Sequence, residues 1–335
     1  MGTWWILRTN NDPFGAIRNF LSVLWIQTKL DGMLLPVYQD GGTGIEPNLV
    51  RDAADLNRAD PLCPFMPENI SRLAIYSSGE ILEERIGFIL HSCEARALIE
   101  KRRLGYLLPE KWISIGIDCL SSFSIEDLEW RLEKAGTLES ITRQSLRFAR
   151  QGGIAPYRFR TACQMCVTPF CEDVDINIGL IGLPVKEFIL IRTRDITTSE
   201  NFNLPRISDG PAPISLRRQH QHMLDFIYER RERCRERNYH LLEDDFPRKP
   251  SEFTALLSAC SPCQKCLEVC PVYEGQLTTQ DDGGGNKSRQ KINQWLESCV
   301  TCGMCEQACP RNLPLAAIHG RIRQELRHDT MPIGM

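Results

Sequence analysis

Hydrophobic and polar positions follow two different periods along the first part of the chain. Short apolar runs, which are typical of buried strands, lie at residues 33–38, 73–76, 86–90, 112–117 and 188–191. Apolar residues recur at helical spacing at residues 15–29, 94–103 and 125–133. Ser124 is a predicted N-cap of the last of these helices, with Asp127 in its first turn. Because strands alternate with helices, we predict an α/β domain with a mixed, partly parallel sheet over residues 1–210.

The pattern changes after a proline-rich stretch at residues 204–213. Residues 215–239 then form a predicted charged helix, whose thin apolar stripe consists of Leu216, Met223, Phe226 and Ile227. We interpret its ERRERCRER segment as a solvated helix face, with a docking arm for a partner subunit as the alternative. His220 and His222 are expected to face solvent on the same helix.

A second, smaller domain follows this helix. Residues 275–287 contain three consecutive glycines and are predicted to form a flexible loop, and residues 288–296 have helical spacing. We therefore divide the chain into three parts: an α/β domain at residues 1–210, a charged linker helix at 211–249 and a small all-α domain at 250–335.

The composition is that of an ordinary globular protein. The chain has 335 residues, 42% hydrophobic and 25% charged, with a formal net charge of −3. This weak acidity argues against nucleic acid as a partner, because counterion release requires a basic face. The apolar runs are too short for a membrane span, and residues 4–7 are too short for the apolar region of a signal peptide. We expect a soluble cytoplasmic protein.

Fifteen cysteines are the unusual feature of the composition. Without a signal peptide, metal binding in a reducing compartment explains them better than a disulfide framework does. Two runs share the spacing C-x2-C-x2-C-x3-C-P of two-cluster ferredoxins, in which the fourth cysteine of a run normally binds the other cluster. Zinc favours isolated C-x2-C pairs and fits this spacing poorly. The predicted ligands are Cys260, Cys263, Cys266 and Cys309 for one 4Fe–4S cluster, and Cys270, Cys299, Cys302 and Cys305 for the other.

The segment between the two runs is 28 residues long and contains the helical pattern at 288–296. With these features, residues 251–325 resemble the α-helical ferredoxin domains of heterodisulfide reductase and of succinate dehydrogenase iron–sulfur subunits. The resemblance implies a domain that relays single electrons and performs no bond chemistry of its own.

Four further cysteines lie in contexts that suggest a third site. Cys93 and Cys119 each follow an apolar run, at the carboxyl end of a predicted strand, where α/β folds place their sites. Cys163 and Cys166 form a C-x2-C pair in a loop. The alternatives are a zinc site in which Cys171 joins this pair, and burial of Cys93 and Cys119 as small hydrophobic residues. Cys63, Cys171 and Cys234 have no assigned role, and His91 is a candidate donor to a cluster sulfur.

Three phrases in this region resemble a known family. They are HSCEARALIEKRRLGYL, ISIGIDCLSSF and TACQMCVTPFCEDVDINIGLIGLPVKEFILIRT. Residues 15–195 resemble the beta subunits of coenzyme F-420-reducing hydrogenase and formate dehydrogenase. The resemblance implies that the matching cysteines, Cys93, Cys119, Cys163 and Cys166, bind a third 4Fe–4S cluster.

The resemblance also implies FAD, but the sequence departs from the family at the flavin loop. The family has a small, glycine-rich turn there, whereas this chain reads NDPFGAIRNFLSVLW. Pro13, Phe14 and Arg18 stand where small residues would let a pyrophosphate approach the backbone. This departure weighs against FAD.

Together these features predict an iron–sulfur electron-transfer subunit that relays single electrons through three 4Fe–4S clusters. Its expected partners are a catalytic subunit of a formate dehydrogenase or hydrogenase, and a heterodisulfide-reductase-like subunit or ferredoxin. The alternative is a flavin-dependent oxidoreductase that exchanges hydride with coenzyme F-420 and passes electrons to the clusters. A redox sensor or assembly protein with structural clusters is a third hypothesis. No catalytic residue is assigned, so whether this chain is itself an enzyme stays open.

Overall fold

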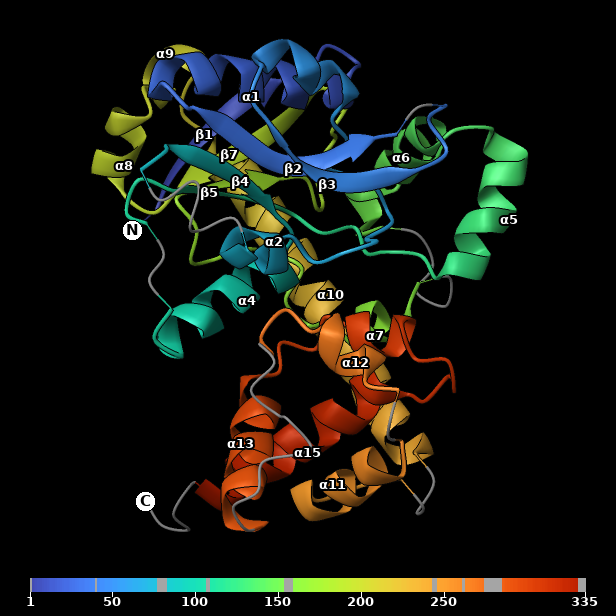
Figure 1. The fold of residues 1–335 in the computed structure, drawn as a ribbon. Coiled ribbons are helices and arrows are strands. Elements are labelled where there is room, and N and C mark those ends of the chain that lie inside the picture. Colours follow the sequence, from blue (N-terminus) through green and yellow to red (C-terminus); the bar gives the residue numbers. More distant parts are fainter. Residues whose placement is uncertain are drawn as a thin grey trace.

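The computed structural model describes residues 2–39, 41–76, 83–106, 109–153, 159–242, 246–260, 263–273 and 285–330. These residues form an α/β body and a helical body, and the long helix α10 (Ile214–Leu241) runs from the first toward the second (Figure 1). Residues 275–284 of the predicted glycine-rich loop lie outside the described residues, and residues 285–287 belong to a helix instead.

The α/β body is built on one mixed sheet of seven strands in the order β1-β7-β6-β5-β4-β2-β3. The strands are β1 (Thr3–Arg8), β2 (Gly32–Tyr38), β3 (Ile45–Val50), β4 (Ile86–Leu90), β5 (Ile113–Ile117), β6 (Ile176–Gly179) and β7 (Phe188–Thr193). Strands β2, β4, β5 and β6 pair in parallel, whereas β3, β7 and β1 pair antiparallel to their neighbours. The predicted fold class, an α/β domain with a mixed sheet followed by a small helical domain, is confirmed.

Helices cover the sheet and then form the second body. In the first body they are α1 (Pro13–Thr28), η1 (Ala53–Arg58), α2 (Ile70–Tyr76), α4 (Ser92–Arg103), α5 (Ile125–Ala135), α6 (Leu138–Leu146), η2 (Ala149–Gln151), α7 (Thr161–Gln164), α8 (Ile196–Asn201) and α9 (Leu204–Ile207). The second body contains α11 (Pro250–Ala259), α12 (Lys265–Glu268), α13 (Gly285–Ser298), α14 (Met304–Gln307) and α15 (Leu315–Thr330). None of the helices in the described ranges is long and apolar enough to cross a membrane.

One predicted strand is wrong. The apolar run at residues 73–76 belongs to helix α2. The helix begins there because the Asn69 side chain accepts a hydrogen bond from the Ser71 backbone N–H (3.2 Å), and the Glu94 carboxylate accepts one from the Ile70 N–H (2.9 Å). Side-chain acceptors at these positions satisfy amides that a helix leaves unpaired at its start. The run is therefore the last part of a short helix.

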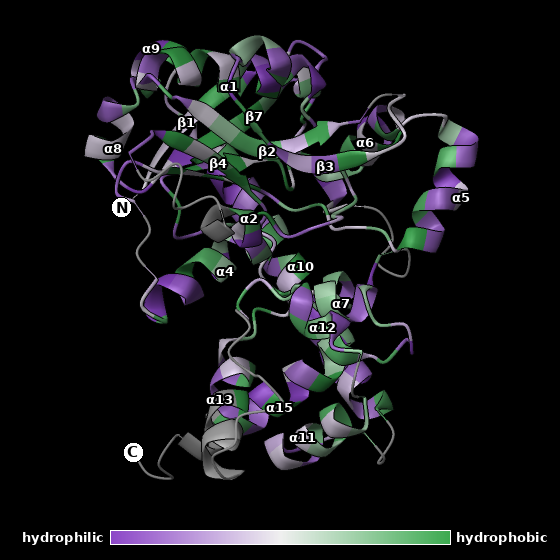
Figure 2. Cartoon of the chain, in the orientation of Figure 1, coloured by the Kyte–Doolittle hydropathy of each residue, from purple (hydrophilic) through white to green (hydrophobic). Residues whose placement is uncertain are grey.

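The two bodies share one apolar cluster. Met66, Ala162 and Met165 of the α/β body pack with residues of the helical body that include Trp295 and Met304. Figure 2 shows that hydrophobic residues gather in the strands, while the outer end of α4 is hydrophilic. Because buried side chains of both bodies interdigitate, their relative position is fixed by packing.

Helix α10 is less solvated than predicted. His220 is buried, against expectation, because its Nδ1 lies 2.7 Å from the Ile181 carbonyl oxygen and its ring packs on Trp4 and Phe170. His222 is exposed, as predicted. In the predicted apolar stripe Ile227 is buried, whereas Phe226 is 48% exposed. The helix therefore packs one face against the sheet and continues toward the helical body.

Candidate metal centres

Four thiols meet where the two bodies adjoin, and we call them the amino-terminal group: Cys93, Cys119, Cys163 and Cys166. Cys93 lies in the first turn of α4, directly after β4, and Cys119 follows β5. The Cys119 backbone N–H donates to the Pro169 carbonyl (2.8 Å), which draws the loop after α7 toward the strand ends. Cys119 is close enough to Cys163 and Cys166 for their negative charges to raise its pKa. The negative charge of Cys119 raises the pKa of Cys93 in the same way. The structure thus brings together the four cysteines predicted for the third cluster.

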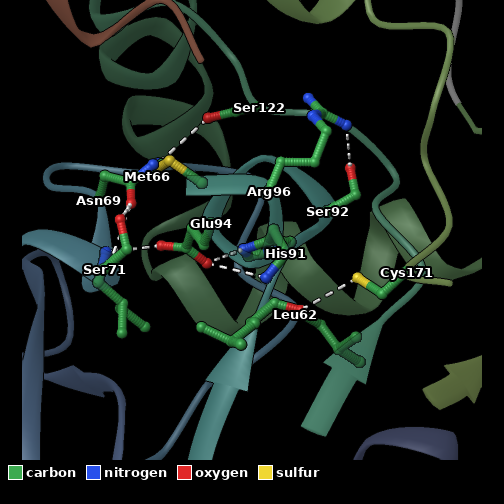
Figure 3. A network of polar contacts seen from close by, with 12 residues as sticks. Leu62, Met66, Asn69, Ser71, His91, Ser92, Glu94, Arg96, Ser122 and Cys171 are labelled. Atoms are coloured by element: carbon green, nitrogen blue, oxygen red, sulfur yellow. Dashed lines mark hydrogen bonds and ion pairs between the residues drawn. The ribbon is translucent and has the colours of Figure 1, made fainter. Parts of the chain in front are cut away.

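A buried polar network fixes the turn that carries Cys93 (Figure 3). Glu94 is 1% exposed, and its carboxylate accepts the backbone N–H groups of His91 (2.8 Å) and Ile70 (2.9 Å). His91 Nδ1 lies 3.2 Å from the same carboxylate. The His91 side chain is therefore engaged with Glu94, and its role is to start α4.

Three arginines surround the amino-terminal group, and we call them the arginine cage: Arg96, Arg160 and Arg231. Arg96 Nη2 donates to Cys166 Sγ and Arg160 Nη2 to Cys163 Sγ, both at 3.8 Å. Arg231 Nη1 donates to the Cys166 carbonyl (2.9 Å). Buried guanidinium groups need hydrogen-bond acceptors, and here the acceptors include the sulfurs of Cys166 and Cys163 and the Cys166 carbonyl.

The pKa values of these thiols follow from burial and from the cage. Burial raises the pKa of Cys93 well above its usual value. Burial, and then the negative charges of Cys163 and Cys166, raise the pKa of Cys119 to about 12. Burial also acts to raise the pKa of Cys166, but Arg96 and Arg231 outweigh it and lower the pKa to about 7. At Cys166 the positive charges thus favour thiolate, which is the form that binds iron.

A second set of thiols lies inside the helical body, and we call it the inner group: Cys270, Cys299, Cys302 and Cys305. Burial, followed by the charge of Cys270, raises the pKa of Cys299 to about 11 and that of Cys302 to about 12. The charge of Cys305 interacts with those of Cys299, Cys302 and Cys270. Three members come from the second cysteine run and one from the first, which is the grouping expected from the spacing.

Neutral donors face the inner group. Trp295 Nε1 donates to Cys270 Sγ (3.3 Å), and the Thr301 backbone N–H donates to Cys299 Sγ (3.4 Å). His319 Nδ1 lies 3.7 Å from Cys299 Sγ. The rings of Trp295, His319 and Phe253 pack on one another, and Phe253 is fully buried. This aromatic packing holds the Trp295 and His319 side chains beside the sulfurs of Cys270 and Cys299.

The remaining predicted ligands form the outer group: Cys260, Cys263, Cys266 and Cys309. Burial, and then the charges of Cys309, Cys260 and Cys263, raise the pKa of Cys266 to about 11. Arg311 Nη1 donates to Cys260 Sγ (3.2 Å). Cys263 is exposed, so this group reaches the protein surface.

The inner group lies next to the amino-terminal group. The charge of Cys302 interacts with those of Cys93 and Arg160. Arg96 Nη2 also donates to the Val300 carbonyl (3.2 Å), and Arg160 Nη1 donates to Gln307 Oε1 (2.8 Å). Two members of the arginine cage therefore connect the bodies at the point where the two thiol groups approach each other.

The donor atoms of all three groups are cysteine sulfurs, the donors that iron–sulfur clusters require. Among the described residues, no three His, Cys, Asp or Glu side chains are arranged to hold one metal ion. The four thiolates of a 4Fe–4S cluster each bind a different iron, so they surround a volume instead of a point. All fifteen cysteines are free thiols, and Cys171 donates to the Leu90 carbonyl (3.7 Å) from a buried position.

The region that corresponds to the flavin loop is occupied by the chain itself. Asp12 caps helix α1: its Oδ1 accepts from the Gly15 N–H (3.1 Å) and from Arg143 Nη1 (2.9 Å). The Arg18 guanidinium stacks on the buried Phe14 ring at 4.0 Å. A carboxylate at this helix start opposes a pyrophosphate there, so these residues do not fit the phosphates of FAD in the family's manner.

A cavity of about 580 Å³ lies beside this helix start. Its lining includes four basic residues, Arg143, Arg147, Arg150 and Lys186. The cavity is large enough for a small ligand, and its charge favours an anion.

Comparisons with known proteins agree with the sequence resemblances. Residues 255–313 match the family described as 4Fe-4S dicluster domain. A stretch of 101 residues is 28% identical to the F420-dependent formate dehydrogenase subunit beta of Methanocaldococcus jannaschii, covering 27% of this chain and 26% of that protein. The chain thus matches about a quarter of the length of this relative.

The fold also matches a solved structure. A chain of the F420-reducing [NiFe] hydrogenase complex from Methanosarcina barkeri superposes with a TM-score of 0.52 and 13% identity, over 72% of this chain and 93% of that one. The predicted resemblance to the beta subunits of these enzymes is confirmed at the level of fold and of one sequence stretch. The helical body carries a 4Fe–4S dicluster domain.

Sequence reasoning found the cysteines but not the residues around them. The arginine cage, Glu94 and Trp295 are not marked by any spacing, because they come from separate elements. Glu94 and Arg96 had a signal of another kind, since both lie in the E-A-R-A phrase that follows Cys93.

Proposed function

We propose that the chain is an electron-transfer subunit that holds three 4Fe–4S clusters, one in each thiol group. The observation that carries this proposal is the link between the amino-terminal and inner groups: Arg96 donates both to Cys166 Sγ and to the carbonyl of Val300, which follows Cys299. Bound clusters would supply one-electron chemistry at potentials that the protein sets. The outer group, with its exposed Cys263, is the end from which a partner exchanges electrons.

Residues around the thiol groups compensate the negative charge that bound clusters and their thiolate ligands would carry. The arginine cage offsets the negative charge of four thiolates in a buried region, where an uncompensated charge would be costly. Trp295 and Thr301 donate hydrogen bonds to sulfurs of the inner group, which also favours added negative charge there.

The partner subunits that we propose are inferred from the proteins that this chain resembles. One relative is a formate dehydrogenase subunit and the other belongs to a hydrogenase complex. We therefore propose a catalytic subunit of one of these types at one end, and a heterodisulfide-reductase-like subunit or ferredoxin at the other. We place the protein in the cytoplasm, where free thiols stay reduced.

The test is a count of iron and flavin in protein purified without oxygen as the intact chain. Three clusters predict about twelve irons and about twelve acid-labile sulfides per chain, and no flavin. Cys119→Ala should lose about a third of the iron, whereas Cys234→Ala, which alters a cysteine outside the three groups, should keep all of it. About eight irons in the unaltered protein would remove the amino-terminal cluster from the proposal.

The second candidate function is the flavin-dependent oxidoreductase that exchanges hydride with coenzyme F-420. The observation that favours it is the basic cavity of about 580 Å³ beside α1. The Asp12 cap opposes it, because the cap places a carboxylate where a flavin pyrophosphate would bind. About one flavin per chain in the same purified protein would establish this candidate and reject a pure relay.

A further inference from the structure

A second basic cavity lies between the two bodies, away from the α1 region. It has a volume of about 410 Å³. Its walls come from α4, the loop after α7, α10, the loop after α13, and α15. They include Arg96, Cys166, Arg235, Tyr239, Thr301 and Arg323. The volume is within the range of small-molecule sites, about 300–1,000 Å³.

The charge of this cavity has one sign. Three guanidinium groups reach it from three different helices, and none of the described residues that line it is Asp or Glu. Arg235 forms an ion pair with Glu232, which lies outside the lining. Arginine groups that converge from separate elements offer the paired N–H donors that phosphate and carboxylate groups accept.

A neutral donor completes the wall. The Tyr239 hydroxyl has no hydrogen-bond partner among the described residues, and burial raises the pKa of Tyr239, so its proton is retained. Gly320 of α15 makes room for this ring, because a Cβ there would lie 2.2 Å from the Tyr239 hydroxyl oxygen. A glycine at this point lets the phenol approach α15 closely.

The cavity also touches two thiol groups. Cys166 of the amino-terminal group lines it, and so does Thr301, whose backbone N–H donates to Cys299 of the inner group. The positive charge of Arg323 acts on Cys299. A ligand bound here would therefore lie beside both groups.

We propose that this cavity binds a small multivalent oxyanion, a molecule bearing phosphate or several carboxylates, held by Arg235, Arg323 and Tyr239. Such an anion would sit at the junction between the amino-terminal and inner groups and change the electrostatic environment of both. This second effect rests on the proposed function, because it requires clusters in these groups, whereas anion binding does not.

The test is isothermal titration calorimetry on the anaerobically purified full chain. Inorganic pyrophosphate and citrate are the two probes, and they distinguish phosphate from carboxylate as the preferred source of charge. Binding by either probe is expected, with the dissociation constant weakened about tenfold or more in Arg323→Gln and in Arg235→Gln. Arg237→Gln alters an exposed arginine on the same helix, outside the cavity, and should bind as the unaltered chain does.

Two results would overturn the proposal. One is the absence of binding for both anions up to about 10 mM. The other is equal binding by the cavity variants and the control variant, which would mean general surface attraction. In the same samples, the low-temperature electron paramagnetic resonance spectrum of the reduced protein should change on adding the bound anion. Calorimetric binding in a chain that contains no iron would reject the proposed function while supporting the site.

Discussion

The hydrogen bond from Trp295 to Cys270 provides a test of how the protein sets the potential of the inner group. Trp295 Nε1 donates to Cys270 Sγ at 3.3 Å, and its ring is 5% exposed. A donor to a ligand sulfur stabilises the reduced cluster more than the oxidised one, because the reduced form carries one more negative charge. Trp295→Phe removes the donor and keeps most of the aromatic packing. The midpoint potential of the inner cluster should therefore become more negative.

The size of the shift follows from the strength of such a bond. The difference between the two oxidation states is about 1 kcal/mol, on the scale of one hydrogen bond's net contribution. For a one-electron couple, a tenfold change in equilibrium constant is about 59 mV, so the expected decrease is about 40 mV. Only one of the polar contacts to the inner group is removed, since Thr301 and His319 remain at Cys299.

The assay is an anaerobic redox titration followed by electron paramagnetic resonance at low temperature. Phe253→Leu is the matched control, because Phe253 packs on both Trp295 and His319 but donates to no sulfur. That variant should move the inner potential by less than about 10 mV. A shift of similar size in both variants would mean that packing, and not the N–H group, sets the potential. An increase in Trp295→Phe would refute the sign of the argument.

Three further predictions concern other parts of the chain. Cys305→Ala should abolish or convert the inner cluster and leave the α/β body folded, so an unchanged electron paramagnetic resonance spectrum after reduction would contradict the ligand assignment. Burial raises the pKa of Asp60 from 3.8 to about 6. Between these two pH values the native state holds a proton that the unfolded state has lost, so the free energy of unfolding falls as pH rises toward and through the native pKa. Between pH 5 and pH 7 the chain should lose about 1 kcal/mol of unfolding free energy relative to Asp60→Asn, and parallel stability curves in calorimetry would reject this shift. Lys265→Glu, at an exposed position beside the outer group, should slow electron exchange with an acidic ferredoxin about tenfold at low salt in stopped-flow measurements, and Lys134→Glu on α5 should not.

The elements that the sequence predicted correctly are those with strong local signals. The parallel strands β4 and β5 are continuous apolar runs, and Ser124 caps α5 by accepting a hydrogen bond from the Asp127 N–H (3.2 Å), as predicted. The edge strands β1 and β3 were not predicted, because each is stabilised by pairing with a single neighbouring strand and not by a strong apolar pattern of its own. The grouping of the cysteines could be inferred because spacing in a run limits which sulfurs can reach one cluster.

Burial of polar side chains was the part that sequence could not predict. His220 lies in a charged helix, and the Ile181 carbonyl and the rings of Trp4 and Phe170, all remote in sequence, make its burial favourable. Arg231 belongs to the ERRERCRER segment that reads as solvated, yet it is 3% exposed and donates to the Cys166 carbonyl. A polar side chain is buried where a hydrogen-bond partner is available, and here the fold supplies that partner from a remote part of the chain.

These buried charges also bear on the direction of electron flow. Arg96 and Arg160 donate directly to sulfurs of the amino-terminal group, whereas the inner group accepts hydrogen bonds from Trp295 and Thr301 and is acted on by the positive charge of Arg323. The outer group has Arg311 and access to water. Positive charge in a buried region stabilises a reduced cluster strongly, since solvent screens it little. We therefore expect the cluster proposed for the amino-terminal group to have the highest potential of the three proposed clusters. In the proposed relay, an electron that enters at the exposed outer group would then pass the inner group and reach the amino-terminal group beside the arginine cage.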